Sequence, residues 1–354
     1  MTDGLGLDLN SLSEGLSKKL GRAIVIEKAE PVGKGFHSEG FKITSKTGET
    51  FFMRKMKSYK MGFAFPERKI SSLNVSHRMA NRIKGPKSIG VFVEHKGKAE
   101  SMPEFDENTA IYNIQEFESE GTSYWSLLEK KKNKTKVDEE DLKELEKITD
   151  FIVDIHKIKY PSKDEEEAKE VYSDSLRSIL GHPELTFTFL HQLGDDHPIF
   201  SMHNQKEYIG LMINLMHKWK DRSDRLSALH GDFWGANIFF RKDSSLWVVD
   251  FSRIPWGDNA VDIAWFTQQY LWFYCMTGNN YYKELGEEFL KMYERKSGDK
   301  EVRKAMCLAL GVLGLIVIST IKKEPSGYYC DDMDQGRKFY NIIVQIMQNG
   351  EFKW

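Results

Sequence analysis

The sequence has no surplus of charge of either sign. Its 354 residues include 51 lysines and arginines against 53 aspartates and glutamates, which gives a formal net charge of −2. Proteins that bind nucleic acid through its phosphates carry a strongly basic face. The balanced charge therefore argues against such a surface, and we expect no nucleic-acid partner.

Cysteine is scarce. Cys275, Cys307 and Cys330 are odd in number and widely spaced, with no CxxC motif or Cys/His ligand spacing. This pattern is typical of a protein from a reducing compartment. The first ten residues contain two aspartates and neither the basic segment nor the apolar segment of a signal peptide. We therefore expect a cytoplasmic protein.

Long apolar runs are also missing. The nearest to a membrane span is Ala305–Ile321, which has 17 residues without a charge and includes two glycines, a serine and a threonine. A bilayer core needs about 20 apolar residues. The run therefore predicts a buried core helix, and we expect no membrane partner.

What is present describes a globular chain of roughly two domains. Hydrophobic residues make up 40% of the sequence, enough to form a core without disulfides or a structural metal. Near the N-terminus, β-rich runs bounded by turn residues predict a small sheet, and Pro66–Met79 starts like a helix. The predicted strands are Ala23–Ile26, Phe41–Ile43, Thr50–Met53 and Ile111–Ile114.

The second part of the chain is predicted to be mainly helical. Asp141–Ile158 repeats apolar residues on one helical face, at Leu142, Leu145, Ile148, Ile152 and Ile155. The fold class expected is α+β, with the boundary between residues 1–117 and residues 118–354.

The most informative segment runs from His230 to Asn237 and continues through two β-rich runs to Asp250. If residues 242–245 form a four-residue hairpin loop, Arg241 faces Leu246 and Asn237 lies opposite Asp250. A carboxamide and a carboxylate then meet at the open end of the hairpin, with Asp232 on the loop leading into it.

Three oxygen-bearing side chains in this order suit Mg²⁺, which binds a few carboxylates together with phosphate oxygens and water. Asp232 would remain able to accept a proton. A hairpin whose polar residues only cap its end is the alternative, and any two of these residues alone would favour it. The three together favour a metal and phosphate site.

The spacing of Asp232, Asn237 and Asp250 resembles the catalytic and metal loops of aminoglycoside phosphotransferases and choline-kinase-like enzymes, which are relatives of the protein kinases. Other segments resemble the same family and occur in the family's order. They are the strand, glycine turn and strand of Val32–Ile43, the third strand Phe51–Arg54, the hinge Ile111–Glu118, the helix Ile148–His156 and the segment Trp256–Asp262.

The resemblance implies a two-lobed protein-kinase-like fold. Residues 1–117 would form a nucleotide-binding lobe with an antiparallel sheet and one helix. Residues 118–354 would form a helical lobe with the catalytic loop and a substrate-binding insert. The absence of an Ala-Pro-Glu segment after Phe251-Ser252 argues against a protein substrate.

The resemblance also implies residue roles. Asp232 would be the catalytic base, and Asn237 and Asp250 the Mg²⁺ ligands. His230 and Asp262 would be structural, with Asp262 orienting the catalytic loop. ATP would be held by a glycine turn and by the hinge, through Gly33, Gly35, Ser38, Gln115, Glu116 and Glu118.

The third strand departs from the family, which usually presents a lysine to the phosphates. Arg54 aligns there, followed by Lys55, and strand alternation sends the two to opposite faces. We favour Arg54 as the residue that contacts the phosphates, with Glu67 as its partner, and keep Lys55 as the alternative.

The acceptor is expected to be a hydroxyl of a small molecule, such as a sugar, an amino sugar or a related metabolite. Arg253 would contact an anionic group or pair with Asp258. Any of six polar residues of the insert could recognise the acceptor, and we expect most of them to be surface residues: Tyr172, Arg177, His182, Asp195, Asp196 and His203. An atypical protein kinase and a non-catalytic ATP-binding regulatory protein are the rival functions. The sequence leaves the oligomeric state and the choice of ATP or GTP open.

Overall fold

The computed structural model divides the chain into two compact units. It describes residues 8–34, 38–56, 66–82, 86–94, 110–117, 121–161, 164–181, 197, 199–251, 255–320 and 333–354. The sheet unit consists of the described parts of Met1–Gly121 and Trp247–Arg253. The helical unit consists of the described parts of Thr122–Leu246 and Ile254–Trp354.

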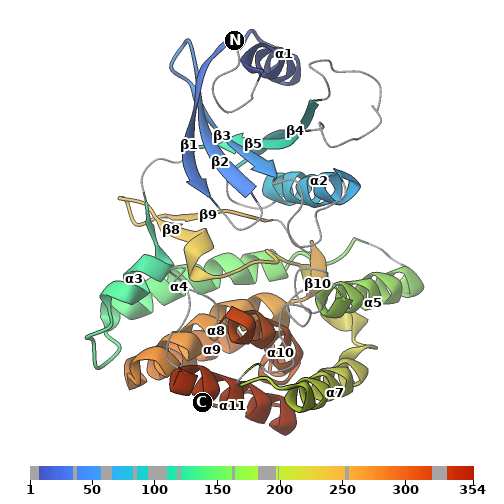
Figure 1. Cartoon of the computed structure of the whole chain (residues 1–354), viewed down its shortest axis with the longest axis vertical. Coiled ribbons are helices and arrows are strands. Elements are labelled where there is room, and N and C mark those ends of the chain that lie inside the picture. Colours follow the sequence, from blue (N-terminus) through green and yellow to red (C-terminus); the bar gives the residue numbers. More distant parts are fainter. Residues whose placement is uncertain are drawn as a thin grey trace. The chain divides into compact units, whose positions relative to one another are not determined.

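The sheet unit contains a five-stranded antiparallel sheet in the order β1-β2-β3-β5-β4 (Figure 1). Its strands are β1 (Ile26–Lys34), β2 (Ser38–Ser45), β3 (Thr50–Met56), β4 (Ser88–Glu94) and β5 (Ala110–Glu116). The turn between β2 and β3 is closed by the N–H of Ser45, which donates to the carbonyl of Glu49 at 2.9 Å. Gly48 allows this turn, because its φ of 83° lies in the left-handed region.

Helices α1 (Leu9–Leu20) and α2 (Pro66–Arg82) pack on this sheet, α1 against β1 and β4, and α2 against β4 and β5. Asp8 caps the start of α1, and Gly21 ends it in the left-handed conformation. Apolar side chains that alternate along the strands form the core with α1. Its buried members are Leu12, Leu16, Ile24, Ile26, Phe41, Ile43, Phe51, Met53 and Ile114.

Three of the four predicted strands and the predicted helix of this unit are confirmed. The strand predicted at Ala23–Ile26 is wrong except for its last residue, because β1 begins at Ile26. The segment is tied to helix α1 instead. The N–H of Ile24 donates to the Ser17 hydroxyl at 2.7 Å, and that hydroxyl donates to the Ile24 carbonyl at 3.0 Å.

The helical unit contains eight described helices and several short strands (Figure 1). The helices are α3 (Tyr124–Lys130), α4 (Glu139–His156), α5 (Glu165–Gly181), α7 (Met202–Trp219), α8 (Ala260–Thr277), α9 (Asn280–Ser297), α10 (Val302–Thr320) and α11 (Met333–Asn349). The short strands of this unit are β6 (Thr122–Ser123), β7 (Leu226–Ala228), β8 (Ile238–Phe240) and β10 (Trp256–Asp258). Strand β9 (Leu246–Val248) begins at Leu246 of this unit, and its other two residues belong to the sheet unit. β6 pairs with β8, and β7 with β10, both antiparallel.

Helix α4 follows the predicted pattern closely. A capping box forms between Asp138 and Asp141, and the first turn is acidic, which suits the positive end of the helix dipole. Leu145, Ile148 and Ile152 of the predicted apolar face are completely buried. The face packs toward α9.

Helix α10 is the predicted buried helix, and it packs against α7, α8 and α11. Glycines allow neighbouring side chains to approach it. A Cβ at Gly314 would lie 2.5 Å from the Tyr208 hydroxyl, and one at Gly311 would lie 2.6 Å from the Met347 sulfur. No helix in the described ranges combines the length and apolarity that a membrane crossing requires. The expected α+β fold class is confirmed, with the antiparallel sheet in the N-terminal part and a larger, mainly helical C-terminal part.

Candidate active site

The segment from His230 to Asn237 brings two of the predicted site residues together. Asp232 is 7% exposed, and the Asn237 side-chain Nδ2 donates to its Oδ2 at 3.1 Å and to its backbone carbonyl at 2.8 Å. Asn237 can reach back because Gly235–Asn237 form a single 3₁₀ turn between loop and strand β8. The carboxylate is therefore held in one orientation by a neighbour five residues away.

Helix α8 anchors this loop from behind through Asp262, which is completely buried. The Asp262 carboxylate accepts the backbone N–H groups of His230 and Gly231, both at 2.8 Å. The imidazole Nδ1 of His230 accepts the N–H of Asp232 at 3.2 Å. Both His230 and Asp262 thus hydrogen-bond the loop backbone, as predicted.

His156 at the end of α4 was not predicted to take part. Its Nε2 lies 3.2 Å from Asp262 Oδ2, and its Nδ1 lies 2.9 Å from the Tyr293 hydroxyl of α9. The three helices α4, α8 and α9 therefore share one hydrogen-bonded chain under the loop. The signal for His156 was its place at the end of the segment that resembles the family helix, while the sequence held no signal for Tyr293.

Glycines shape the loop at two positions. Gly231 has a φ of 84°, which favours glycine, and its N–H points at Asp262. Gly235 donates its N–H to the Gln269 side chain at 2.9 Å, and a Cβ there would lie 2.5 Å from the same Gln269 oxygen and 2.8 Å from the Trp125 backbone nitrogen. The close packing at Gly235 therefore requires a residue without a side chain, and the backbone conformation at Gly231 favours glycine.

The hairpin register predicted for β8 and β9 is wrong by one residue. The Arg241 N–H donates to the carbonyl of Ser245, not of Leu246, and the Ser244 N–H donates to the Arg241 carbonyl. The loop has three residues because Ser244 adopts a left-handed φ of 63°. Three-residue hairpin loops commonly end in such a residue. The register argument for placing Asn237 opposite Asp250 is therefore lost.

A second group of predicted residues meets within the sheet unit. The Arg54 guanidinium donates to the two carboxylate oxygens of Asp250 at 2.6 and 3.4 Å, and its Nε donates to the Ser38 hydroxyl at 3.0 Å. Arg54 is 12% exposed and Asp250 28%. Asp250 has a φ of 68°, in the left-handed region that residues other than glycine adopt infrequently, and such conformations cluster at active sites and ligand-binding positions. Arg54, rather than its neighbour Lys55, makes this ion pair.

The other predicted nucleotide residues lie as follows. Gly33 is exposed and pairs with Gly40 across β1 and β2. Gln115 is buried and donates to the Asn113 side chain at 2.5 Å, so its own side chain is engaged within the sheet. The Glu116 N–H donates to the carbonyl of Lys87 at 3.1 Å, and the Glu116 carboxylate accepts the Lys87 N–H at 3.1 Å. Gly35, Glu118 and the side chain of Glu67 lie outside the described residues.

Three of the candidate acceptor-binding residues, Tyr172, Arg177 and His203, lie in the described part of the chain. Tyr172 is completely buried in α5 and donates to Asp258 Oδ2 at 2.9 Å. Burial, and then the Asp258 charge, raise the pKa of the Tyr172 phenol. Its predicted role in acceptor recognition is therefore wrong. Arg177 and His203 are exposed and pair with acidic residues on their own helices. His182, Asp195, Asp196 and Arg253 lie outside the described residues.

Arg225 is the buried partner of Asp258, which the sequence did not indicate. Its Nε donates to Asp258 at 2.8 Å. Its terminal nitrogens Nη1 and Nη2 donate to Asp299 at 3.0 and 2.8 Å, and Nη2 also donates to Asn259 at 2.8 Å. Burial lowers the pKa of Arg225, but the two carboxylates outweigh it and raise that pKa. This network fixes the segment that leads into helix α8.

The donor chemistry of the predicted ligands fits Mg²⁺. The Asn237 amide donates through Nδ2, which leaves Oδ1 as its acceptor atom. The Asp250 oxygens each have a further lone pair beside the bond from Arg54. The described residues contain no group of three or more His, Cys, Asp or Glu side chains that could hold a metal. A Mg²⁺ site that combines one or two carboxylates with phosphate oxygens requires no such group.

Solved structures share this fold at low sequence identity. A protein assigned as a fructosamine-3-kinase from Haemophilus somnus 129PT matches with a TM-score of 0.52 and 13% identity, over 96% of this chain and 97% of that one. Aminoglycoside phosphotransferase APH(4)-Ia in a ternary complex with ADP and hygromycin B matches at 0.51 and 14%, over 97% and 100%. APH(3'')-Id from Streptomyces rimosus ATCC10970 matches at 0.51 and 14%, over 87% and 98%.

These matches confirm the predicted protein-kinase-like fold. No curated protein sequence matches the chain. A family model described as the phosphotransferase enzyme family matches residues 28–307, which is more than three quarters of the chain. This confirms the predicted resemblance to aminoglycoside phosphotransferases, and the chain belongs to the phosphotransferase enzyme family.

Proposed function

We propose that this protein transfers the γ-phosphoryl group of ATP, with Mg²⁺, to a hydroxyl group of a small molecule such as a sugar or an amino sugar. Membership of the phosphotransferase enzyme family supports the reaction class. Complexes of the similar enzyme APH(4)-Ia with ADP and hygromycin B and with AMP-PNP and hygromycin B support the nucleotide and the kind of acceptor.

The observation that carries the proposal is the fixed carboxylate of Asp232. It is held by Asn237 on a loop whose backbone is clamped by Asp262. Phosphoryl transfer needs positioning more than covalent help from the protein. In the proposed reaction the acceptor oxygen bonds to the γ-phosphorus, the bond between that phosphorus and the bridging oxygen breaks, and ADP leaves. The hydroxyl proton passes to Asp232.

The remaining roles follow from charge and donor type. Arg54 is the cation that we assign to the ATP phosphates, because its guanidinium suits phosphate oxygens and already contacts Ser38. Asn237 and Asp250 are assigned as Mg²⁺ ligands. A bound Mg²⁺ offsets the charge that develops on the phosphate oxygens. Lys55 remains the alternative phosphate contact.

Consumption of ATP or GTP with Mg²⁺ across sugars, amino sugars, aminoglycosides, choline-like alcohols and nucleosides tests the proposal. Asp232→Ala is expected to reduce turnover of the active acceptor by about 10²- to 10⁴-fold, the usual contribution of a general base. Nucleotide binding should persist in this variant. Asp243→Ala is the matched control, since Asp243 is an exposed aspartate in the hairpin turn.

Other outcomes would replace the proposal. Unchanged turnover in Asp232→Ala would remove Asp232 as the base. Phosphorylation of a protein mixture, with no turnover of any small molecule, would favour an atypical protein kinase. Mg²⁺-dependent nucleotide binding without turnover of any acceptor would favour a regulatory protein.

A further inference from the structure

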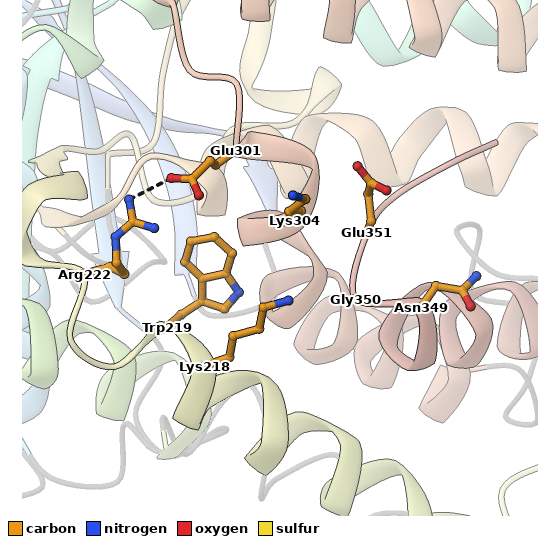
Figure 2. Close-up of a pocket in the computed structure, with 8 residues that line it drawn as sticks. All are labelled: Lys218, Trp219, Arg222, Glu301, Lys304, Asn349, Gly350 and Glu351. Carbon is orange, nitrogen blue, oxygen red and sulfur yellow. Dashed lines mark hydrogen bonds and ion pairs between the residues drawn. The ribbon is translucent and has the colours of Figure 1, made fainter.

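A cavity of about 300 Å³ lies in the helical unit, apart from the residues of the candidate active site. It is formed where the C-terminal ends of α7 and α11 meet the N-terminal end of α10 (Figure 2). Its volume is at the lower end of the range of ligand pockets and suits a small ligand. The lining residues are Lys218, Trp219, Arg222, Glu301, Lys304, Asn349, Gly350 and Glu351.

The two acidic residues of this cavity already have cationic partners. Glu301 pairs with Arg222 at 2.8 Å, and Glu351 pairs with Lys353 at 2.8 Å. Arg222 is further engaged by Asp224 at 2.8 Å. These carboxylates therefore give the cavity little net negative charge.

The two lysines of the cavity differ from its carboxylates in their ion pairs. Among the ion pairs between residues that the structure describes, those of the cavity involve Arg222, Glu301 and Glu351, and none involves Lys218 or Lys304. The Lys218 ammonium lies beside the end of α11, since it would be 3.5 Å from a Cβ at Gly350. The pKa of the Glu351 carboxyl is lowered, mainly by its hydrogen bond from Lys353 and also by nearby positive charges, one of which is Lys304. Three cationic and two acidic side chains line the cavity, so its formal charge is +1.

Trp219 adds an independent observation. It is only 4% exposed, and its indole Nε1 is buried without a hydrogen-bond partner among the described residues. Figure 2 shows this nitrogen on the edge of the ring that is nearer the Lys218 ammonium, and Lys304 lines the same cavity. Buried polar groups in folded proteins nearly always have partners. An indole N–H and two ammonium groups are all donors, so the missing partner must be an acceptor.

We propose that this cavity binds a phosphate group, as inorganic phosphate or as a small phosphate monoester, through Lys218, Lys304 and the indole N–H of Trp219. A phosphate monoester carries a charge of about −1.5 to −2 at neutral pH, which two ammonium groups balance, and it offers three acceptor oxygens. The inference does not depend on the proposed phosphotransfer.

Isothermal titration calorimetry of the full chain tests the proposal, with inorganic phosphate and a hexose monophosphate as probes at constant ionic strength. Lys218→Gln, Lys304→Gln and Trp219→Phe are each expected to weaken binding about tenfold or more, as the loss of a charge-assisted or buried hydrogen bond would. Lys220→Gln is the matched control. Lys220 is exposed and follows Trp219 but does not line the cavity, so binding should change less than about twofold.

Phosphate could also bind at the nucleotide site, and a further variant separates the two sites. Arg54→Ala removes the guanidinium assigned to ATP and should leave binding in the cavity unchanged. Tighter binding of the hexose monophosphate than of inorganic phosphate would identify a phosphate ester as the ligand, and the reverse order would identify the free ion.

The proposal is overturned if neither probe binds, or if Lys218→Gln and Lys304→Gln bind both probes as the wild type does. Lys218 and Lys304 are exposed, so these two variants are expected to fold. They decide the outcome even if Trp219→Phe does not fold.

Discussion

Replacement of Asp262 by asparagine should loosen the loop that carries Asp232. The buried Asp262 carboxylate accepts two backbone N–H groups, both at 2.8 Å. Asparagine has one acceptor oxygen, so one of the two amides would face an NH₂ group. A hydrogen bond to a charged group contributes about 1.5–3 kcal/mol, and a buried donor without a partner costs about 1–3 kcal/mol. We therefore expect Asp262→Asn to lower the free energy of unfolding by about 2–4 kcal/mol.

Urea denaturation of Asp262→Asn against Asp154→Asn measures this effect. Asp154 is also a helical aspartate, but it is 64% exposed and, among the described residues, pairs with Lys157 alone, so its loss should cost no more than about 0.5 kcal/mol. Hydrogen exchange provides a local readout, because the amides of His230 and Gly231 should exchange faster in Asp262→Asn alone. Equal unfolding free energies in the two variants, together with unchanged exchange at His230 and Gly231, would refute the reasoning.

Three further perturbations test other parts of the structure. Gly235→Ala should destabilise the protein by about 1–3 kcal/mol through overpacking, whereas Gly210→Ala, where a Cβ meets nothing within 4 Å, should stabilise α7 by roughly 0.5–1 kcal/mol. The midpoint temperatures of thermal unfolding of the two variants test this difference, and equal midpoints would contradict the crowding at Gly235. Arg225→Met should cost about 3–5 kcal/mol in urea denaturation, because it leaves buried carboxylates without their cation. Arg177→Met, on the exposed surface, should stay within about 0.5 kcal/mol, and a similar value for Arg225→Met would argue against the network. A hydrogen bond from Lys134, and then one from the backbone, lower the pKa of Asp138 to about 2. The stability that this carboxylate contributes is present above pH of about 4 and is lost as pH falls toward about 2. The unfolding temperature of Asp138→Asn should therefore fall less between these two pH values than that of the wild type.

Local patterns allowed much of the fold to be predicted. Phe41 and Ile43 flank the polar Lys42, Phe51 and Met53 occupy the same alternate positions of the next strand, and all four are buried in the sheet. The contact between Asp232 and Asn237 also depends on residues that are near in sequence, so the loop spacing was informative. Helix α1 was missed although Asp8 and Gly21 are its caps, and this signal was available in the sequence.

Features that depend on distant residues or on one unusual backbone angle could not be predicted. The hairpin between β8 and β9 shifted by one residue because Ser244, which is not a glycine, adopts a left-handed conformation. Tyr172 looked like a polar ligand contact, but it points at Asp258, 86 residues away. The partners of Arg225 are likewise set by packing of the whole helical unit rather than by any local pattern.

The sheet unit is built from two separate stretches of chain. Arg54 in β3 pairs with Asp250, which lies 196 residues later in the sequence, after more than half of the helical unit. During synthesis the five strands of this unit can therefore pair long before Asp250 leaves the ribosome. A fragment that ends at Gly121 would contain the whole five-stranded sheet but would lack the carboxylate of Asp250. The order in which the chain emerges thus delays completion of the Arg54 ion pair until more than two thirds of the protein has been made.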